Sequence, residues 1–299
     1  MKQPFKLWFE LESRCNLRCP FCFNHWKSGA SVAPARSPVE KLKKSITTLL
    51  EVIDCTQVAL SGGEPLLNPE LPAWVDFFAR KNIPSILTTN GFLLSQEKAT
   101  LLSGLGLGAV QIPVLSGDRA LHDKLSGRPC WEQTIRALVA SRTAGLPVSI
   151  VFVATRENLG SLPGVLSMAR TLGIRRIIFN RFIASGAGVI NAPALQVTDE
   201  EVVSALESSK IELYVGEVEI SLGVPLELSR PSPILRTMRP SEHTAQITVD
   251  ASGAVKRCNQ AVSSLSLATP GLTRATILEA LGQPLKSGEC YCADKRLEK

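Results

Sequence analysis

The sequence lacks a long apolar run of the kind that crosses a membrane. Its longest uncharged stretch, residues 99–117, is interrupted by glycine at positions 104, 106 and 108 and by Pro113, so it is typical of a helix end, a turn and a strand. A signal peptide is also missing, because residues 1–4 lead directly into a short strand-like run. We therefore expect a cytoplasmic protein with no membrane partner.

A concentrated basic surface is missing as well. The chain has 33 Lys and Arg against 27 Asp and Glu, so its net charge of +6 is small for 299 residues. The short basic clusters at residues 41–44 and 175–176 do not interleave with aromatic residues, as a nucleic-acid groove would require. Because 44% of the residues are hydrophobic and 20% are charged, the composition is that of a globular protein rather than a disordered one. We expect no nucleic-acid partner.

Cysteine, in contrast, is plentiful. Eight cysteines are many for a chain with no sign of secretion. Thiols in the cytoplasm stay reduced, so clustered cysteines there indicate metal binding rather than disulfides.

Strand and helix patterns alternate along the first two-thirds of the chain. Apolar runs predict strands over residues 5–11, 57–60, 83–88, 109–115, 147–153 and 176–179. Each run is followed by a helical pattern, and the connections are short. This alternation predicts an α/β fold with a parallel sheet, closed into a partial (β/α)6 TIM barrel. In such a barrel the chemistry lies on the loops that follow the carboxyl ends of the strands.

Two of the helix starts carry capping patterns. Ser37 is expected to cap the first helix, with Pro38 in the first helical position and Glu40 completing a capping box. Thr198, followed by three acidic residues, is expected to cap a later helix.

The pattern changes near residue 211. Residues 211–222 alternate like an edge strand, and residues 245–249 and 254–257 flank a turn at 250–253, which predicts a hairpin. We therefore expect two domains, a barrel over residues 1–210 and a small α+β domain over residues 211–299.

Three cysteines follow the first predicted strand directly. Cys15, Cys19 and Cys22 have the spacing Cys-x3-Cys-x2-Cys, which places them at the barrel mouth. Three thiolates this close repel one another unless a cation neutralises them, and soft sulfur suits iron–sulfur clusters or zinc. Three protein ligands leave one metal position open, as catalytic sites do. The alternative is a structural zinc site completed by His25 or by a distant cysteine.

This loop, with the aromatic Phe21 just before its last cysteine, resembles the radical S-adenosylmethionine superfamily. The resemblance covers about residues 5–210. It implies that Cys15, Cys19 and Cys22 hold a [4Fe–4S] cluster whose fourth iron binds the amino and carboxylate groups of S-adenosylmethionine. It also implies that Phe21 lies beside the adenine.

A second motif, Gly62-Gly63-Glu64-Pro65, follows the second predicted strand. Without Cβ atoms, the two glycines let the backbone approach a ligand closely. In the family this loop binds the methionyl amine of S-adenosylmethionine, so the resemblance makes Glu64 the acceptor for that ammonium group.

Weaker cofactor candidates follow the later strands. Thr88 and Asn90, in a Thr-Thr-Asn-Gly segment, either line the cofactor pocket or form a plain turn with Gly91 at positive φ. Many relatives have a Ser-Leu-Asp-Gly segment after the fourth strand, whose serine touches the cofactor. This chain departs from that segment, which leaves Ser116 as the candidate.

Two arginines complete this candidate set. Arg156 follows the fifth strand and either binds the methionyl carboxylate or is an exposed helix-start arginine. Arg181 follows the sixth strand, in a segment that resembles the closing rim of the family's barrel, and is expected near the substrate.

Cys258, Cys290 and Cys292 form a second set near the carboxyl end. The segment from Gly253 to Cys258 resembles the Gly-x4-Cys strand of SPASM and twitch domains, which add an auxiliary iron–sulfur cluster to radical enzymes. Those domains carry a further cysteine before the glycine, where this chain has His243. The resemblance implies an auxiliary cluster held by three thiolates, with His243 or an open position as the fourth ligand. A zinc site or plain tail cysteines are the alternatives.

The remaining cysteines stand alone. Cys55 is expected to be a buried apolar thiol. Cys130 lies near a predicted helix start, which lowers the pKa of a thiol. It either donates a hydrogen atom to a substrate radical, as in some peptide epimerases that resemble this chain, or simply packs.

The resemblance implies an enzyme that cleaves S-adenosylmethionine reductively and abstracts hydrogen from a substrate carbon through a 5′-deoxyadenosyl radical. Relatives with an auxiliary-cluster tail mostly crosslink, epimerise or form thioethers in ribosomally made peptides, so we expect a peptide substrate. Oxidation of a small molecule such as an aminocyclitol is the alternative, and a non-enzymatic redox sensor is a remote one. The expected partners are a reductase or flavodoxin-type electron donor and a separate leader-peptide recognition protein.

Overall fold

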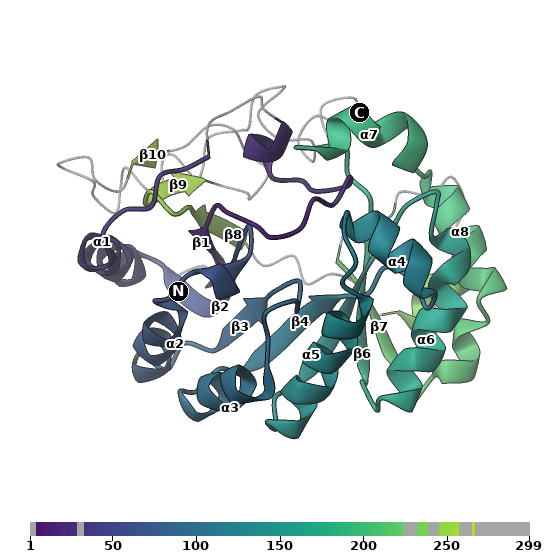
Figure 1. Ribbon diagram of the computed structural model, residues 1–299, viewed down its shortest axis with the longest axis horizontal. Coiled ribbons are helices and arrows are strands. Elements are labelled where there is room, and N and C mark those ends of the chain that lie inside the picture. Colours follow the sequence, from purple (N-terminus) through teal and green to yellow (C-terminus); the bar gives the residue numbers. More distant parts are fainter. Residues whose placement is uncertain are drawn as a thin grey trace.

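One curved sheet organises the computed structural model, which describes residues 4–28, 33–223, 226, 232–238, 245–256 and 265–266. The sheet has ten strands in the order β10-β9-β8-β1-β2-β3-β4-β5-β6-β7 (Figure 1). Their bounds are β1 Pro4–Glu12, β2 Asp54–Gly62, β3 Ser85–Thr88, β4 Ala109–Pro113, β5 Val148–Ala154, β6 Arg176–Arg181, β7 Glu219–Leu222, β8 Ala245–Val249, β9 Ala254–Lys256 and β10 Leu265–Ser266. Strands β1 to β7 run parallel in chain order. The predicted α/β partial barrel is therefore confirmed.

Helices connect these strands. Their bounds are α1 Val39–Val52, α2 Leu71–Arg80, α3 Gln96–Gly104, α4 Arg119–Ser126, α5 Trp131–Thr143, α6 Leu162–Thr171, α7 Gly188–Leu195 and α8 Asp199–Ser208. Within the described residues, 3-10 turns accompany them: η1 His25–Ser28, η2 Pro65–Leu67, η3 Leu159–Ser161, η4 Ile211–Tyr214 and η5 Pro233–Thr237. Figure 1 shows α1, α2, α3, α5 and α6 along the outer side of the curved sheet, and α7 at its rim. None of the described helices combines the length and apolar character needed to span a bilayer.

The core lies between the sheet and these outer helices. In β1, Leu7 and Phe9 are fully buried, and Phe9 meets the rings of Trp74 and Phe78 of α2 at centroid distances of 4.7 and 6.4 Å. Because side chains alternate across a strand, Glu10 belongs to the opposite, inner face of the sheet. The apolar spacing of β1 thus fixes which of its residues face the helices and which face the barrel interior.

The two capping predictions have different outcomes. At α8, Thr198 accepts from the backbone of Glu201, and the Glu201 side chain accepts from the backbone of Thr198, so the predicted cap is a complete capping box. The predicted box at α1 is wrong. Its Ser37 hydroxyl instead donates to the Ser252 carbonyl oxygen at 2.9 Å, which ties the start of α1 to the turn between β8 and β9.

The segment after residue 211 joins the same sheet. The predicted edge strand over residues 211–222 forms only at its end, as β7, which lies at one edge of the described sheet. Residues 211–214 form the 3-10 turn η4, and Gly216 at φ +88° follows before β7 begins. β8 and β9 form the predicted antiparallel hairpin. β8 also pairs in parallel with β1, so Phe5 lies opposite Ala245. A domain boundary near residue 211 stays a prediction.

Candidate functional site

The cysteine loop leaves the carboxyl end of β1, as the sequence predicts. Its backbone is compact: the Cys22 N–H donates to the Cys19 oxygen at 3.2 Å, and the Leu17 N–H donates to Cys15 Sγ at 3.5 Å. Cys19 Sγ donates to the Ser126 oxygen at 3.5 Å, which attaches the loop to the end of α4. The three thiols of the loop are free.

Burial and neighbouring charges act on the pKa values of these thiols. Burial raises the pKa of Cys19 far above its usual range, and the neighbouring thiols of Cys22 and Cys15 raise it further. Burial also raises the pKa of Cys22, while the nearby Lys27 ammonium lowers both values. Mutual coulombic effects of this kind require the sulfurs to lie near one another. Since thiolates are the metal-binding form, a bound cation would have to deprotonate this set.

The three thiols of the cysteine loop suit one kind of metal group in particular. In the described part of the chain, no three His, Cys, Asp or Glu side chains are grouped as ligands of a single metal ion. Each cysteine of a [4Fe–4S] cluster binds a different iron, so its sulfurs need not converge on one point. The donor set fits such a cluster.

The glycine loop after β2 presses directly against the start of the cysteine loop. The Gly63 N–H donates to the Glu12 oxygen at 2.6 Å, and the Glu64 N–H donates to the Arg14 oxygen at 2.8 Å. A Cβ on Gly62, which has φ +131°, would lie 2.2 Å from the Glu12 oxygen, and a Cβ on Gly63 would lie 2.2 Å from the Arg14 oxygen. Only glycine fits at either position, so both glycines are needed to join the two loops.

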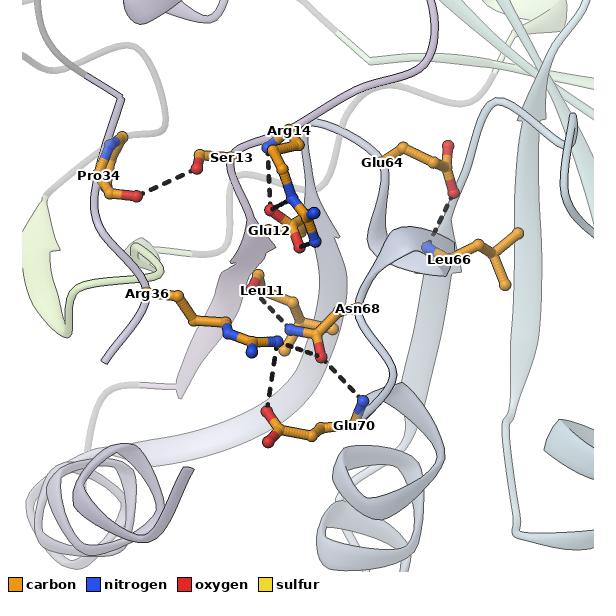
Figure 2. A network of polar contacts seen from close by, with 10 residues as sticks. All are labelled: Leu11, Glu12, Ser13, Arg14, Pro34, Arg36, Glu64, Leu66, Asn68 and Glu70. Carbon is orange, nitrogen blue, oxygen red and sulfur yellow. Dashed lines mark hydrogen bonds and ion pairs between the residues drawn. The ribbon is translucent and has the colours of Figure 1, made fainter. Parts of the chain in front are cut away.

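Figure 2 shows the side chains that brace this junction. The Arg14 guanidinium donates to both carboxylate oxygens of Glu12, at 3.0 and 2.8 Å. The amide of Asn68, which precedes α2, donates to the Leu11 oxygen at 2.9 Å, and its Oδ1 accepts from the Glu70 N–H at 2.9 Å. The end of β1 and the start of α2 are thus held in a fixed relative position. Sequence reasoning did not identify this brace.

Glu64 is completely buried and is held by groups of the chain itself. It accepts from Thr89 Oγ1 at 2.6 Å, from the Asn90 N–H at 2.8 Å and from the Leu66 N–H at 3.0 Å. Burial raises the pKa of Glu64, while these hydrogen bonds lower it. Glu64 therefore ties the loop after β2 to the loop after β3. Its predicted contact with an ammonium group stays a prediction.

The other predicted cofactor contacts, Thr88, Ser116 and Arg156, each contact a group of the chain itself. Thr88 donates to Gln111 Oε1 of β4 at 3.4 Å. Ser116 is buried in a turn, where its hydroxyl donates to Ser161 Oγ at 3.1 Å and accepts from the Asp118 N–H at 2.9 Å. Arg156 is exposed, and its guanidinium lies 3.9 Å from a carboxylate oxygen of Glu201 in α8.

Helix α7 holds the far side of the cysteine loop. The Gly188 N–H donates to the Cys22 oxygen at 3.3 Å, and Asn191 Nδ2 donates to the Pro20 oxygen at 3.0 Å. The partly buried Phe21 packs against a small apolar cluster consisting of Leu115, Leu125, Phe182 and Leu195. Sequence reasoning missed this support, because α7 carries no capping or spacing pattern that links it to the cysteines.

Arg181 forms a buried ion pair at the end of β6. Its Nε lies 2.8 Å from Asp199 Oδ1 at the start of α8, and each of the two side chains is 8% exposed. This contact fixes α8 to the sheet and gives Arg181 a structural role; its predicted place near the substrate stays a prediction.

Replacing Arg181 with methionine is expected to lower the free energy of unfolding by about 3 kcal/mol, because it removes the guanidinium that pairs with the buried Asp199 carboxylate. Urea unfolding of the variant measures this loss. Unfolding at an unchanged urea concentration would contradict this structural role of Arg181.

The two isolated cysteines are both packed. Cys130 is buried, and its N–H donates to Asp123 Oδ1 at 2.8 Å. Burial raises the pKa of its thiol, so the predicted lowering at a helix start is wrong. Its coulombic effect on Cys19 places it near the cysteine loop. Burial raises the pKa of Cys55 to about 11, and its Sγ donates to the Gln57 oxygen at 3.4 Å.

Cys258, Cys290, Cys292 and His243 lie outside the described residues. The strand that leads toward Cys258 is described, and it carries a buried charge cluster. Lys256 Nζ lies 3.7 Å from Glu10 Oε2 of β1 and 3.5 Å from Asp250 Oδ2. Burial raises the pKa of Glu10 to about 7, although Lys256 lowers it. The same ammonium lies 5.9 Å from the ring centroid of Trp26 in η1, so this strand comes close to the cysteine loop.

Known proteins resemble the chain over most of its length. It is 27% identical to a PqqA peptide cyclase of Gluconobacter oxydans over 281 residues, which cover 92% of this chain and 76% of the relative. Its fold matches the crystal structure of Streptococcus suis SuiB bound to the precursor peptide SuiA, with a TM-score of 0.72 and 13% identity, over 96% of this chain and 69% of that one. The structure of anSMEcpe with bound AdoMet matches with a TM-score of 0.68 and 20% identity, over 90% and 79% of the two chains.

The family model for the Radical SAM superfamily matches residues 10–169. This match covers more than half of the chain and includes both the cysteine loop and the glycine loop that lies against it. The chain therefore belongs to the Radical SAM superfamily.

Proposed function

We propose that this enzyme holds a [4Fe–4S] cluster through Cys15, Cys19 and Cys22 and uses it to cleave S-adenosylmethionine reductively. The observation that carries the proposal is the direct packing of the glycine loop on a compact loop that holds three free thiols. When bound, the cluster supplies the electron that breaks the carbon–sulfur bond of S-adenosylmethionine, and the resulting 5′-deoxyadenosyl radical takes hydrogen from the substrate.

The residues of the chain contribute position and exclusion of water. Gly62 and Gly63 let the glycine loop pack directly on the start of the cysteine loop, and Glu64 fixes the loop after β3 beside them. Phe21, within the cysteine loop, is the proposed neighbour of the adenine. Thr88, Asn90, Ser116 and Arg156 remain further proposed cofactor contacts.

The test of this activity is anaerobic reconstitution of the full chain with iron and sulfide, followed by dithionite and S-adenosylmethionine. We expect release of 5′-deoxyadenosine, measured by chromatography. An iron-loaded protein that leaves S-adenosylmethionine intact would contradict the proposal and would support a redox sensor.

For the substrate we propose a ribosomally made peptide that the enzyme crosslinks, epimerises or joins through a thioether. Two similarities support this choice: a peptide cyclase is similar over 92% of the chain, and a structure with a bound precursor peptide shares its fold over 96%. Short peptides encoded beside this gene, made synthetically, are the probes. A crosslink or thioether would lower the peptide mass by two hydrogens, and an epimerised residue would take up one deuterium from heavy water. Turnover of aminocyclitols but of no such peptide would favour small-molecule oxidation.

The proposal extends to a twitch or SPASM-like domain over residues 211–299 with an auxiliary cluster at Cys258, Cys290 and Cys292, and with His243 or the substrate as its fourth ligand. The position of Lys256, two residues before Cys258 and in contact with Glu10, supports a place near the barrel mouth. Iron analysis after reconstitution distinguishes one cluster, with about four irons per chain, from two, with about eight. A flavodoxin-type electron donor, a separate leader-recognition protein and a cytoplasmic location complete the proposal.

A further inference from the structure

The loop after β3 is fixed by a buried carboxylate. Glu64 accepts the Asn90 N–H at 2.8 Å and the Thr89 hydroxyl at 2.6 Å. Gly91 continues this loop at φ +80°, which returns the chain toward α3. The backbone of Asn90 is therefore held beside the cysteine loop, independently of any ligand.

The orientation of the Asn90 side chain follows from its own contacts. Its Oδ1 accepts from the Phe92 N–H at 2.9 Å, so the amide nitrogen must point the other way. Nδ2 donates to Asn16 Oδ1 at 2.8 Å and lies 3.8 Å from Cys15 Sγ. The two hydrogens of Nδ2 thus have two acceptors, and one of these acceptors is a sulfur of the cysteine loop.

The backbone of Asn16 is held by Arg128. Arg128 donates to the Asn16 oxygen at 3.1 Å, and its guanidinium stacks over the Phe92 ring at 4.3 Å from the centroid. Asn16 Nδ2 is buried without a hydrogen-bond partner in the described part of the chain. This orphan donor next to Cys15 matches a site whose remaining acceptor belongs to a bound group.

We propose that Asn90 is a positioning residue that donates an N–H to the sulfur of Cys15 and thereby raises the reduction potential of the [4Fe–4S] cluster. Reduction adds negative charge to a cluster, and a hydrogen bond to its sulfur stabilises that charge. Glu64 acts through Asn90, because its carboxylate holds the loop that carries the donor. This inference rests on the three-cysteine cluster of the proposed function.

The test is a redox titration of the reconstituted full chain, followed by electron paramagnetic resonance. In Asn90→Leu, a side chain of similar size without a donor, we expect the equilibrium constant for one-electron reduction to fall about tenfold, which corresponds to about 59 mV. Asn90→Asp is expected to shift the potential in the same direction, because it replaces the donor with a negative charge. Adding S-adenosylmethionine identifies the signal, since the proposed function has it bind the cluster of Cys15, Cys19 and Cys22 and not the auxiliary one.

The matched control is Asn191→Leu. Asn191 holds the Pro20 oxygen of the same loop through its amide but donates to no sulfur, so the potential should stay unchanged. Equal shifts in the Asn90 and Asn191 variants would overturn the inference, as would an unchanged potential in an iron-loaded Asn90→Leu variant. Loss of iron from both Asn90 variants would make Asn90 a structural residue and would overturn it too. Iron missing from the unchanged protein would instead refute the cluster itself.

Discussion

The Cys19→Ala variant is expected to hold no intact [4Fe–4S] cluster and to lose 5′-deoxyadenosine formation by more than about 100-fold, beyond the loss typical of changes outside the ligand shell. Burial and its two neighbouring thiols all disfavour the ionised form of the Cys19 thiol and raise its pKa. The nearby Lys27 ammonium offsets only part of that cost, so a bound cation has to supply the rest. Iron content and 5′-deoxyadenosine release, both measured after anaerobic reconstitution, test this expectation.

Cys55→Ala is the matched control for this variant. Cys55 lies near the start of β2, at the opposite end of the strand from the glycine loop, and its thiol contacts a backbone oxygen. The same chemical change there should leave iron content and activity unaltered. A Cys19→Ala protein with full iron content would remove the basis for the cluster assignment.

The Gly63→Ala variant is expected to lose about 4 kcal/mol of unfolding free energy, which places it among the severe single substitutions. The added Cβ would lie 2.2 Å from the Arg14 oxygen and 2.7 Å from the Ser13 oxygen, and both are backbone atoms that cannot rotate away. Separating the two loops would also break the hydrogen bond from Gly63 to Glu12. Urea unfolding of the cluster-free protein measures the loss, so the result does not depend on reconstitution.

Gly160→Ala provides the comparison. A Cβ at Gly160 meets nothing within 4 Å, so the stability should change by less than about 0.5 kcal/mol. If Gly63→Ala unfolds at the same urea concentration as Gly160→Ala, the two loops do not pack as closely as the structure shows.

Local patterns in the sequence were sufficient to predict much of this molecule. The strands β1 to β6 follow from short apolar runs, and the place of the cysteine loop follows from its position directly after β1. The glycine loop was found for the same reason, since two adjacent glycines after a strand are a local feature. Such signals work because each depends on neighbouring residues only.

The contacts that escaped prediction join residues far apart in the chain. Glu64 looked like a ligand-binding carboxylate, but its three donors come partly from the loop after β3, and they make a fully buried position tolerable. The Arg181–Asp199 pair is hidden in the same way, because a rim arginine and a helix-start aspartate are each ordinary in isolation. Helix α7 lacks a clear apolar face, since Pro193 interrupts it and Ile190 is 71% exposed.

The parallel pairing of β8 with β1 has a consequence for how the chain folds. During synthesis β1 emerges well before residues 245–249, the partner for one of its edges, because β2 to β7 lie between them in the chain. Until then that edge presents unpaired backbone groups, which are prone to pair with other chains. Long-range closure of this kind slows folding, so nascent chains that stop before residue 245 should depend most on chaperones.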